Sequence, residues 1–270
     1  METIEAFDTL IYFFEHIDIL MLIFVRCLGF FMAVPIISGQ NIYAQARLFL
    51  ALCVAVALFM SGHVTTVYVI DTTPGYVYLV LIEFLVGLAM GYIVFAVFNL
   101  MFFAGQLMDF QIGFMMVNVI DPMTQMQVPL TGNILYFGLM ALVVVTGGLH
   151  AFFLTFFYSY QILPIGTAFI IGNQSLAWYM VYILAESTVL AVRLAMPIVS
   201  SMLLITVALG IMVKTVPQLN VFVVGMPLRL FVGTFLFMLI MIPNLGFMYS
   251  SIFDMASNAM REVIWGMRSP

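Results

Sequence analysis

The chain has 270 residues, of which 65% are hydrophobic and 7% are charged, and its 7 basic and 12 acidic side chains give a formal net charge of −5. A soluble domain has about 45–50% apolar and about 25% charged residues, so the composition excludes an ordinary water-soluble enzyme and a disordered linker. The negative charge also excludes a nucleic-acid binder. The sequence is therefore that of a membrane-type protein, whose apolar surface must be covered by lipid or by other protein.

The N-terminal stretch is acidic: its first eighteen residues carry five Asp or Glu side chains and no Lys or Arg. A secretory signal peptide begins with basic residues, so we expect this N-terminus to be retained. Because cytoplasmic loops carry an excess of Lys and Arg, the same acidity predicts that it lies away from the cytoplasm.

Six apolar runs follow, and their lengths fit a bilayer poorly. A spanning helix needs about 20 apolar residues, whereas these runs vary from 13 to 38 residues. Proline removes a backbone donor, so Pro35, Pro197, Pro227 and Pro243 predict kinks or helix ends. We expect an all-α fold of long, broken hydrophobic helices with about six hydropathy spans. The runs are 19–37, 48–60, 76–108, 134–171, 176–213 and 221–242.

Small residues repeat at four-residue spacing in two of these runs. Gly87 and Gly91 form one such ridge, and Ala51 and Ala55 form another. Small residues at this spacing let helix backbones approach closely in apolar surroundings. We therefore predict that Gly87 and Gly91 lie where helices pack closely and that they serve subunit packing.

Residues 106–133 differ from the runs on either side and are predicted to be neither helix nor span. They hold six amide side chains, two acids and no base, with turn signals at Gly113, Asp121-Pro122 and Pro129. The centre, 114–117, is nevertheless strongly apolar, and connections of this length are usually functional. Two interpretations remain open: a re-entrant pore segment, or a folded-over connector that packs on a neighbour.

The last segment has a different pattern. From Ile252 to Ile264 apolar residues recur at steps of three and four, with polar residues between them. This periodicity predicts an amphipathic helix within 247–270 that has one solvated face.

Charged side chains within the apolar runs are candidates for function, because each costs about 2.5–3.5 kcal/mol on insertion scales if unpaired. Glu186 and Arg193 are seven residues apart and so share one helix face. They could serve, with Glu83, an ion-coupled secondary transporter, or they could be buried structural pairs or snorkelling groups. A transporter is expected to show an internal repeat, and the two halves of the sequence show no convincing similarity. The side chains are Arg26, Glu83, Glu186, Arg193 and Arg229.

The sequence contains no arrangement typical of catalysis. There is no nucleophile–base pattern, phosphate-binding loop or ligand-spaced cluster of His, Cys, Asp and Glu. We therefore expect no enzyme activity, no cofactor and no metal site.

Several strings resemble one family. The string Pro217-Gln218-Leu219-Asn220, continued by VFVVGMPL at 221–228, resembles the signature of the FliR family of flagellar export-gate proteins. LAVRLAMP at 190–197, GGLH at 147–150 and SYQILPIG at 159–166 fit the same pattern in order and spacing, so the resemblance covers nearly the whole chain. Injectisome relatives usually depart from VFVVGMPL, which favours the flagellar branch. The motif residues are Arg193, Pro197, Pro217, Gln218, Asn220, Gly225 and Pro227.

The resemblance implies a non-enzymatic subunit of the type III export gate in the bacterial inner membrane and flagellar basal body. In that family, hairpins of FliR, FliP and FliQ form one helical heteromeric assembly, with FlhB at the gate entrance and FlhA nearby. Unfolded flagellar substrates pass through its channel.

The resemblance also implies a division of the chain into functional parts. As one subunit (1–270), it would have an N-terminal helical part (1–105), a plug loop (106–133), C-terminal helical hairpins (134–246) and an amphipathic C-terminal helix (247–270). The plug loop would close the resting channel, with a turn at Asp121 and Pro122. The implied plug residues are Phe110, Gly113, Phe114, Met115, Met116 and Val117.

Overall fold

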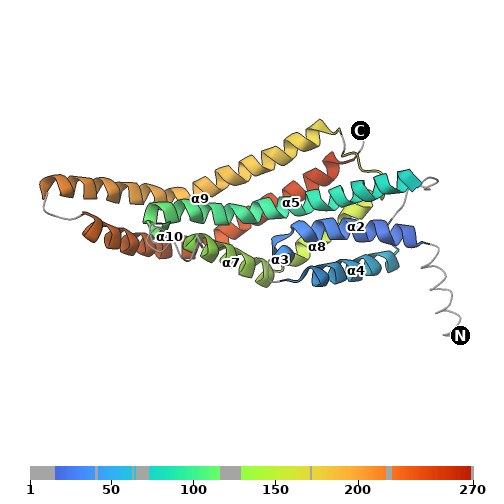
Figure 1. The fold of residues 1–270 in the computed structure, drawn as a ribbon, viewed down its shortest axis with the longest axis horizontal. Coiled ribbons are helices and arrows are strands. Elements are labelled where there is room, and N and C mark those ends of the chain that lie inside the picture. The colour runs from blue at the N-terminus through green and yellow to red at the C-terminus, as the bar shows by residue number, and fades with distance from the viewer. Residues whose placement is uncertain are drawn as a thin grey trace. The chain divides into compact units, whose positions relative to one another are not determined.

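The computed structural model describes residues 16–39, 42–62, 64, 73–115, 129–170, 172–216 and 221–268. These residues are helical almost throughout (Figure 1), and among them β pairing is confined to one isolated bridge between Ala168 and Arg268. The predicted all-α fold is confirmed. The helices are α2 (Ile17–Ala33), α3 (Pro35–Ser38), α4 (Ala44–Met60), α5 (Thr73–Ile112), α7 (Leu130–Val145), α8 (Gly148–Ile162), α9 (Gln174–Thr215) and α10 (Val221–Gly266).

Each of the six apolar runs forms a helix or a pair of helices. Within the described residues, α5, α9 and α10 are long and apolar enough to cross a membrane, and α4 is a shorter apolar helix. The run 134–171 covers most of α7 and all of α8, and the two helices are bent by 72° at a short break. Gly147 lies in that break at φ 76°, a conformation that glycine adopts without strain. The helices α7 and α8 could therefore form one broken span.

The prolines act less uniformly than the sequence predicts. Pro35 begins α3 directly after the extended residue Val34, so it does mark a helix boundary. By contrast, Pro197 lies inside α9 and both Pro227 and Pro243 lie inside α10, and none of them ends its helix. Each proline removes one backbone hydrogen bond, and long apolar helices tolerate this loss when neighbouring groups compensate.

The chain forms two compact units. One comprises Met1–Phe95, His150–Val181 and Ala256–Pro270, and the other comprises Ala96–Leu149 and Tyr182–Met255. The helix α10 runs without interruption through residues 246 and 247. The amphipathic C-terminal sequence is thus the last part of a long helix, not a helix of its own.

The first unit is held together by close helix packing. Ala51 and Ala55 of α4 are fully buried, and α4 packs against α2. Phe30 of α2 stacks on Phe156 of α8, with ring centroids 4.3 Å apart. Stacked aromatic side chains and small-residue contacts together give this unit a core that is made within the chain.

Candidate functional site

The predicted plug segment is partly helical. The helix α5 continues to Ile112, so residues 106–112 are not loop, and α7 begins at Leu130. Gly113 ends the first helix because its φ of 100° lies in the left-handed region, while its N–H still donates to the carbonyl of Asp109 at 3.0 Å. The connection between the two helices is therefore shorter than 106–133.

The implied plug residues lie at the end of α5 and just beyond it. Phe110 occupies the last turn of α5 with 69% of its surface exposed. Gly113 is buried, and Phe114 and Met115 are half-buried. Met116, Val117, Asp121 and Pro122 lie outside the described residues.

The two helices that flank this segment are joined by a buried carboxylate. Asp109 of α5 is fully buried and accepts hydrogen bonds from the backbone N–H of Thr131, at 3.1 and 3.2 Å, and from its hydroxyl. Thr131 is the second residue of α7, whose N-cap residue, Pro129, offers no side-chain cap. Asp109 therefore satisfies an orphan donor at the start of a helix that lies 22 residues further along the chain.

Two glycines allow this approach. A Cβ built on Gly105 of α5 would collide with the backbone of Gly132 and Thr131 of α7. The backbones of α5 and α7 are thus in direct contact beside the Asp109–Thr131 hydrogen bonds. The sequence predicts that Asp109 lies in a polar loop, because nothing local marks its partner; the capping role is visible only in the structure.

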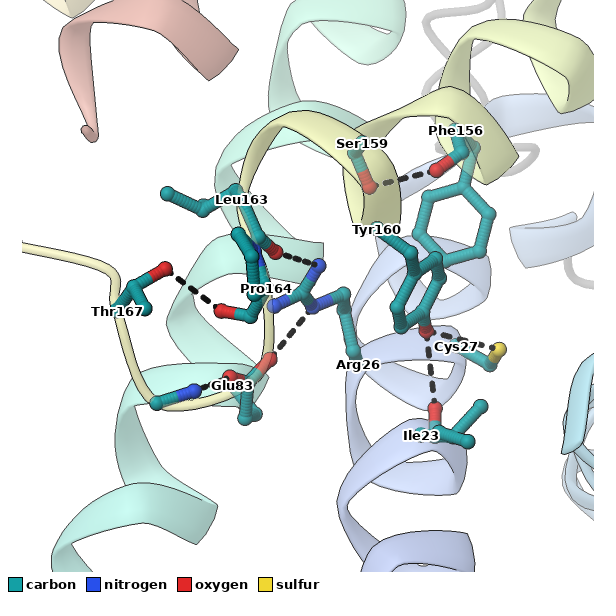
Figure 2. A network of polar contacts seen from close by, with 11 residues as sticks. Ile23, Arg26, Cys27, Glu83, Phe156, Ser159, Tyr160, Leu163, Pro164 and Thr167 are labelled. Atoms are coloured by element: carbon teal, nitrogen blue, oxygen red, sulfur yellow. Dashed lines mark hydrogen bonds and ion pairs between the residues drawn. The ribbon is translucent and has the colours of Figure 1, made fainter. Parts of the chain in front are cut away.

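A second buried polar cluster lies in the first unit. The guanidinium Nε of Arg26 is 2.5 Å from Glu83 Oε2, and both side chains are fully buried (Figure 2). Arg26 Nη1 also donates to the carbonyl of Leu163 at 3.1 Å, and Glu83 Oε1 accepts from the N–H of Gly166 at 3.0 Å. The pair thereby ties α2 and α5 to the connection that follows α8.

Tyr160 of α8 covers the arginine in this cluster. Its ring centroid lies 4.4 Å from Cζ of Arg26, which is within range of a cation–π interaction. Its hydroxyl donates to the carbonyl of Ile23 at 3.3 Å and lies 3.6 Å from Sγ of Cys27 (Figure 2). Because Arg26 and Glu83 are both buried and bonded to each other, they fit the buried structural pair among the interpretations of the charges in the apolar runs.

The glycine ridge of α5 lies against α2 next to this cluster. A Cβ on Gly87 would collide with the backbone of Arg26 and Phe30, and one on Gly91 would lie 2.7 Å from Cβ of Ala33 and from the carbonyl of Phe30. The two glycines thus pack within the chain, and their role in packing between subunits stays a prediction. Among the described residues, no group of three or more His, Cys, Asp or Glu side chains could hold a metal ion.

Comparison with known proteins places these features in a family. The family described as bacterial export proteins, family 1, matches residues 17–256. The chain belongs to this family. It is 31% identical to the flagellar biosynthetic protein FliR of Bacillus subtilis, covering 90% of this chain and 93% of the relative. It is 26% identical to FliR of Escherichia coli, covering 88% and 91%. The secretion system apparatus protein SsaT of Salmonella typhimurium is 27% identical over 54% of this chain and 56% of its own.

The family-motif residues of this export protein fall in its second unit. Arg193 and Pro197 lie exposed on α9, while α10 carries Gly225, which is buried, and Pro227, which is exposed. Pro217, Gln218 and Asn220 lie outside the described residues.

The two charges in the middle of α9 differ from the buried pair of the first unit. Glu186 and Arg193 are both exposed. Among the described residues of this export protein, the ion pair is formed by Arg26 and Glu83, not by the two charges of α9.

Proposed function

We propose that this export protein is a non-enzymatic core subunit of the flagellar type III export gate. With FliP and FliQ it would form the channel for unfolded flagellar substrates. The observation that carries the proposal is the match along nearly the whole chain to proteins named flagellar biosynthetic protein FliR. Matches to a secretion system apparatus protein and to Yop proteins translocation protein T support an export role of the type III kind.

The proposal includes the surroundings of the subunit. FlhB would lie at the gate entrance and FlhA nearby, in the bacterial inner membrane within the flagellar basal body. Long apolar helices support a membrane-associated place for the chain. Affinity purification of the tagged chain from its native membrane tests this part, and we expect FliP and FliQ among the recovered proteins. Recovery of the folded chain without either protein would contradict the proposal.

We further propose that the connection between α5 and α7 helps to close the resting channel. Its two ends are fixed by Asp109 and Thr131, so the segment between them starts and finishes at a defined place. The exposed ring of Phe110 and the flexible side chain of Met115 suit a seal that must yield to varied polypeptides and close again.

Leakage through the assembled gate tests the plug. Deletion of 113–117 should raise the flux of small ions through the gate. A sharper variant is Phe110→Ser, with Phe137→Ser as its matched control, because Phe137 is 65% exposed on α7 and outside the implied plug residues. Unchanged leakage for the deletion and for Phe110→Ser, in gates that assemble normally, would remove the plug assignment.

The alternative of an ion-coupled transporter is weakened by one contact. Such a transporter would use Glu83, Glu186 and Arg193, but the Glu83 carboxylate is bonded to Arg26 and to the Gly166 N–H. Proteoliposomes that contain the chain alone separate the two functions. Ion-coupled flux of the isolated chain would favour the transporter, whereas a gate subunit should show none without its partners.

A further inference from the structure

The exposed apolar surface of α9 is too long for a bilayer. The helix has 42 residues, which corresponds to about 63 Å at about 1.5 Å per residue. Large apolar side chains are exposed along most of it, from Trp178 near its start to Met212 near its end. These two residues are separated by about 50 Å of helix.

Tilting does not remove this mismatch. A hydrocarbon layer of about 30 Å could enclose 50 Å of helix only at a tilt above about 50°, and membrane helices tilt by about 0–40°. Lipid can therefore cover only part of the exposed face. The rest must be covered by protein, because a continuous apolar surface of this size is not left in water.

Two charges lie within the same exposed face. Glu186, Val189, Arg193 and Met196 follow one another at steps of three, four and three residues, so they share one side of the helix. All four are exposed. If the bilayer encloses this part of α9, the charges exclude lipid contact. If the bilayer encloses the charge-free stretch 194–213 instead, the apolar neighbours of Glu186 require a protein cover. Both placements put protein over this side of α9.

The order of the charges selects the kind of protein. In a membrane dimer of two identically oriented copies, related by an axis along the bilayer normal, equivalent residues lie level. Glu186 would then face Glu186 and Arg193 would face Arg193, and like charges repel. A different chain avoids this repulsion when its own charges have the opposite order.

We propose that the Glu186–Met196 side of α9 docks an apolar helix of a different chain. That helix carries a basic residue level with Glu186 and an acidic residue level with Arg193, about 10 Å apart along the helix. The inference deepens the proposed function and rests on it, because it requires the chain to assemble with other gate subunits.

Charge reversal in the full chain, expressed in its native membrane, tests the proposal. Glu186→Arg and Arg193→Glu should each lower the amount of partner protein that co-purifies by about tenfold or more, since each places two like charges opposite each other in the interface. Glu262→Arg is the matched control, because Glu262 is also exposed but lies in the amphipathic part of α10. It should recover the partner within about twofold.

A double variant separates a different chain from the alternatives. If the two charges paired with each other or with a second copy in the reverse orientation, Glu186→Arg combined with Arg193→Glu would restore assembly. A different chain keeps its own charges, so the double variant should remain as defective as the single ones. Restoration by the double variant, or no loss in the single variants, would overturn the docking face.

Photo-crosslinking gives a second readout that leaves the charges intact. A photoreactive residue at Val189 or Met196 should yield a cross-link to a different gate subunit. Cross-links to another copy of this chain, or to lipid alone, would contradict the proposal. If the unmodified chain recovers its partners while these variants behave normally, only the docking face fails. If the unmodified chain recovers no partner, the proposed function itself fails.

Discussion

Two pairs of charged residues lie within apolar helices, one pair in each unit of the molecule, and their surroundings are opposite. In the first unit, Arg26 and Glu83 are fully buried and bonded to each other, to a backbone carbonyl and to a backbone N–H. In the second, Glu186 and Arg193 point outward from α9. The comparison shows that Arg26 and Glu83 compensate each other inside the chain, whereas Glu186 and Arg193 lie on its surface. The second unit also holds a charge that is compensated internally, because the buried Asp109 is bonded to Thr131.

Burial also differs between the long helices, each of which has residues in both units. In α5, 56% of the most apolar stretch of the helix is buried within the chain. In α9 and in α10, the buried share of the corresponding stretch is 17%. The helix α5 is thus largely covered by its own chain. The helices α9 and α10 carry apolar surface that becomes buried only in a membrane or a complex.

The largest effect is expected from breaking the internal pair. Arg26→Leu would leave Glu83 charged and buried without its partner, which costs about 3–5 kcal/mol of unfolding free energy. We expect a large fall in the denaturant midpoint of the detergent-extracted protein. Glu186→Leu, at an exposed position of α9, is the matched control and should leave the midpoint nearly unchanged.

The double variant Arg26→Leu with Glu83→Leu sharpens this test. Removing both charges avoids the unpaired carboxylate, so its cost should be well below that of Arg26→Leu alone. If the two single costs simply add in the double variant, the pair is not coupled and the contrast between the units is lost.

The next largest effect is expected at the contact of α5 with α2. Gly87→Ala places a Cβ against the backbone of Arg26 and 2.9 Å from the N of Phe30. Overpacking of this kind costs about 1–3 kcal/mol. Gly210→Ala in α9 is the control, because nothing lies within 4 Å of its added Cβ, and alanine favours a helix by about 0.5–1 kcal/mol. Equal denaturant midpoints for the two variants would show that the close packing of α2 and α5 is not required.

A smaller effect is expected from Asp109→Ala. The change leaves the N–H and hydroxyl of Thr131 without their acceptor at the start of α7, and loss of a helix cap costs about 0.5–2 kcal/mol. Asp109→Asn keeps one acceptor oxygen and should lose less. The shift in denaturant midpoint measures both variants, and the reverse order would contradict the capping role.

The smallest effect is expected at the outward charges. Glu186→Gln should change the denaturant midpoint of the detergent-extracted chain by less than about 0.5 kcal/mol in free energy, as at other exposed positions. A loss comparable to that of Arg26→Leu would mean that Glu186 is satisfied inside the chain.

The sequence predicted the helices well because long apolar runs have few alternatives in an apolar environment, where each backbone group must be bonded within its own segment. It predicted their ends less well. Pro197, Pro227 and Pro243 indicated possible breaks, yet α9 and α10 continue through them. The polar residues 106–112 suggested a loop, although the helical hydrogen bonds of α5 extend to Ile112.

The sequence showed which charged residues needed compensation, but not which residues would provide it. Arg26 and Glu83 were recognisable as charges that needed compensation, but they are 57 residues apart, and no periodicity connects residues on different helices. Asp109 was visible as an acid near a turn, while its role in capping α7 depends on the close approach of Gly105 and Gly132.

Composition, run length and local motifs are enough to predict an all-α, apolar protein of the export family. Which charges are paired within the chain and which stay exposed depends on the tertiary structure. The physical reason is that the energy of a charge in an apolar region depends on what lies within a few ångströms of it in space. Folding supplies that neighbour to Arg26, whereas Glu186 and Arg193 lie exposed on α9.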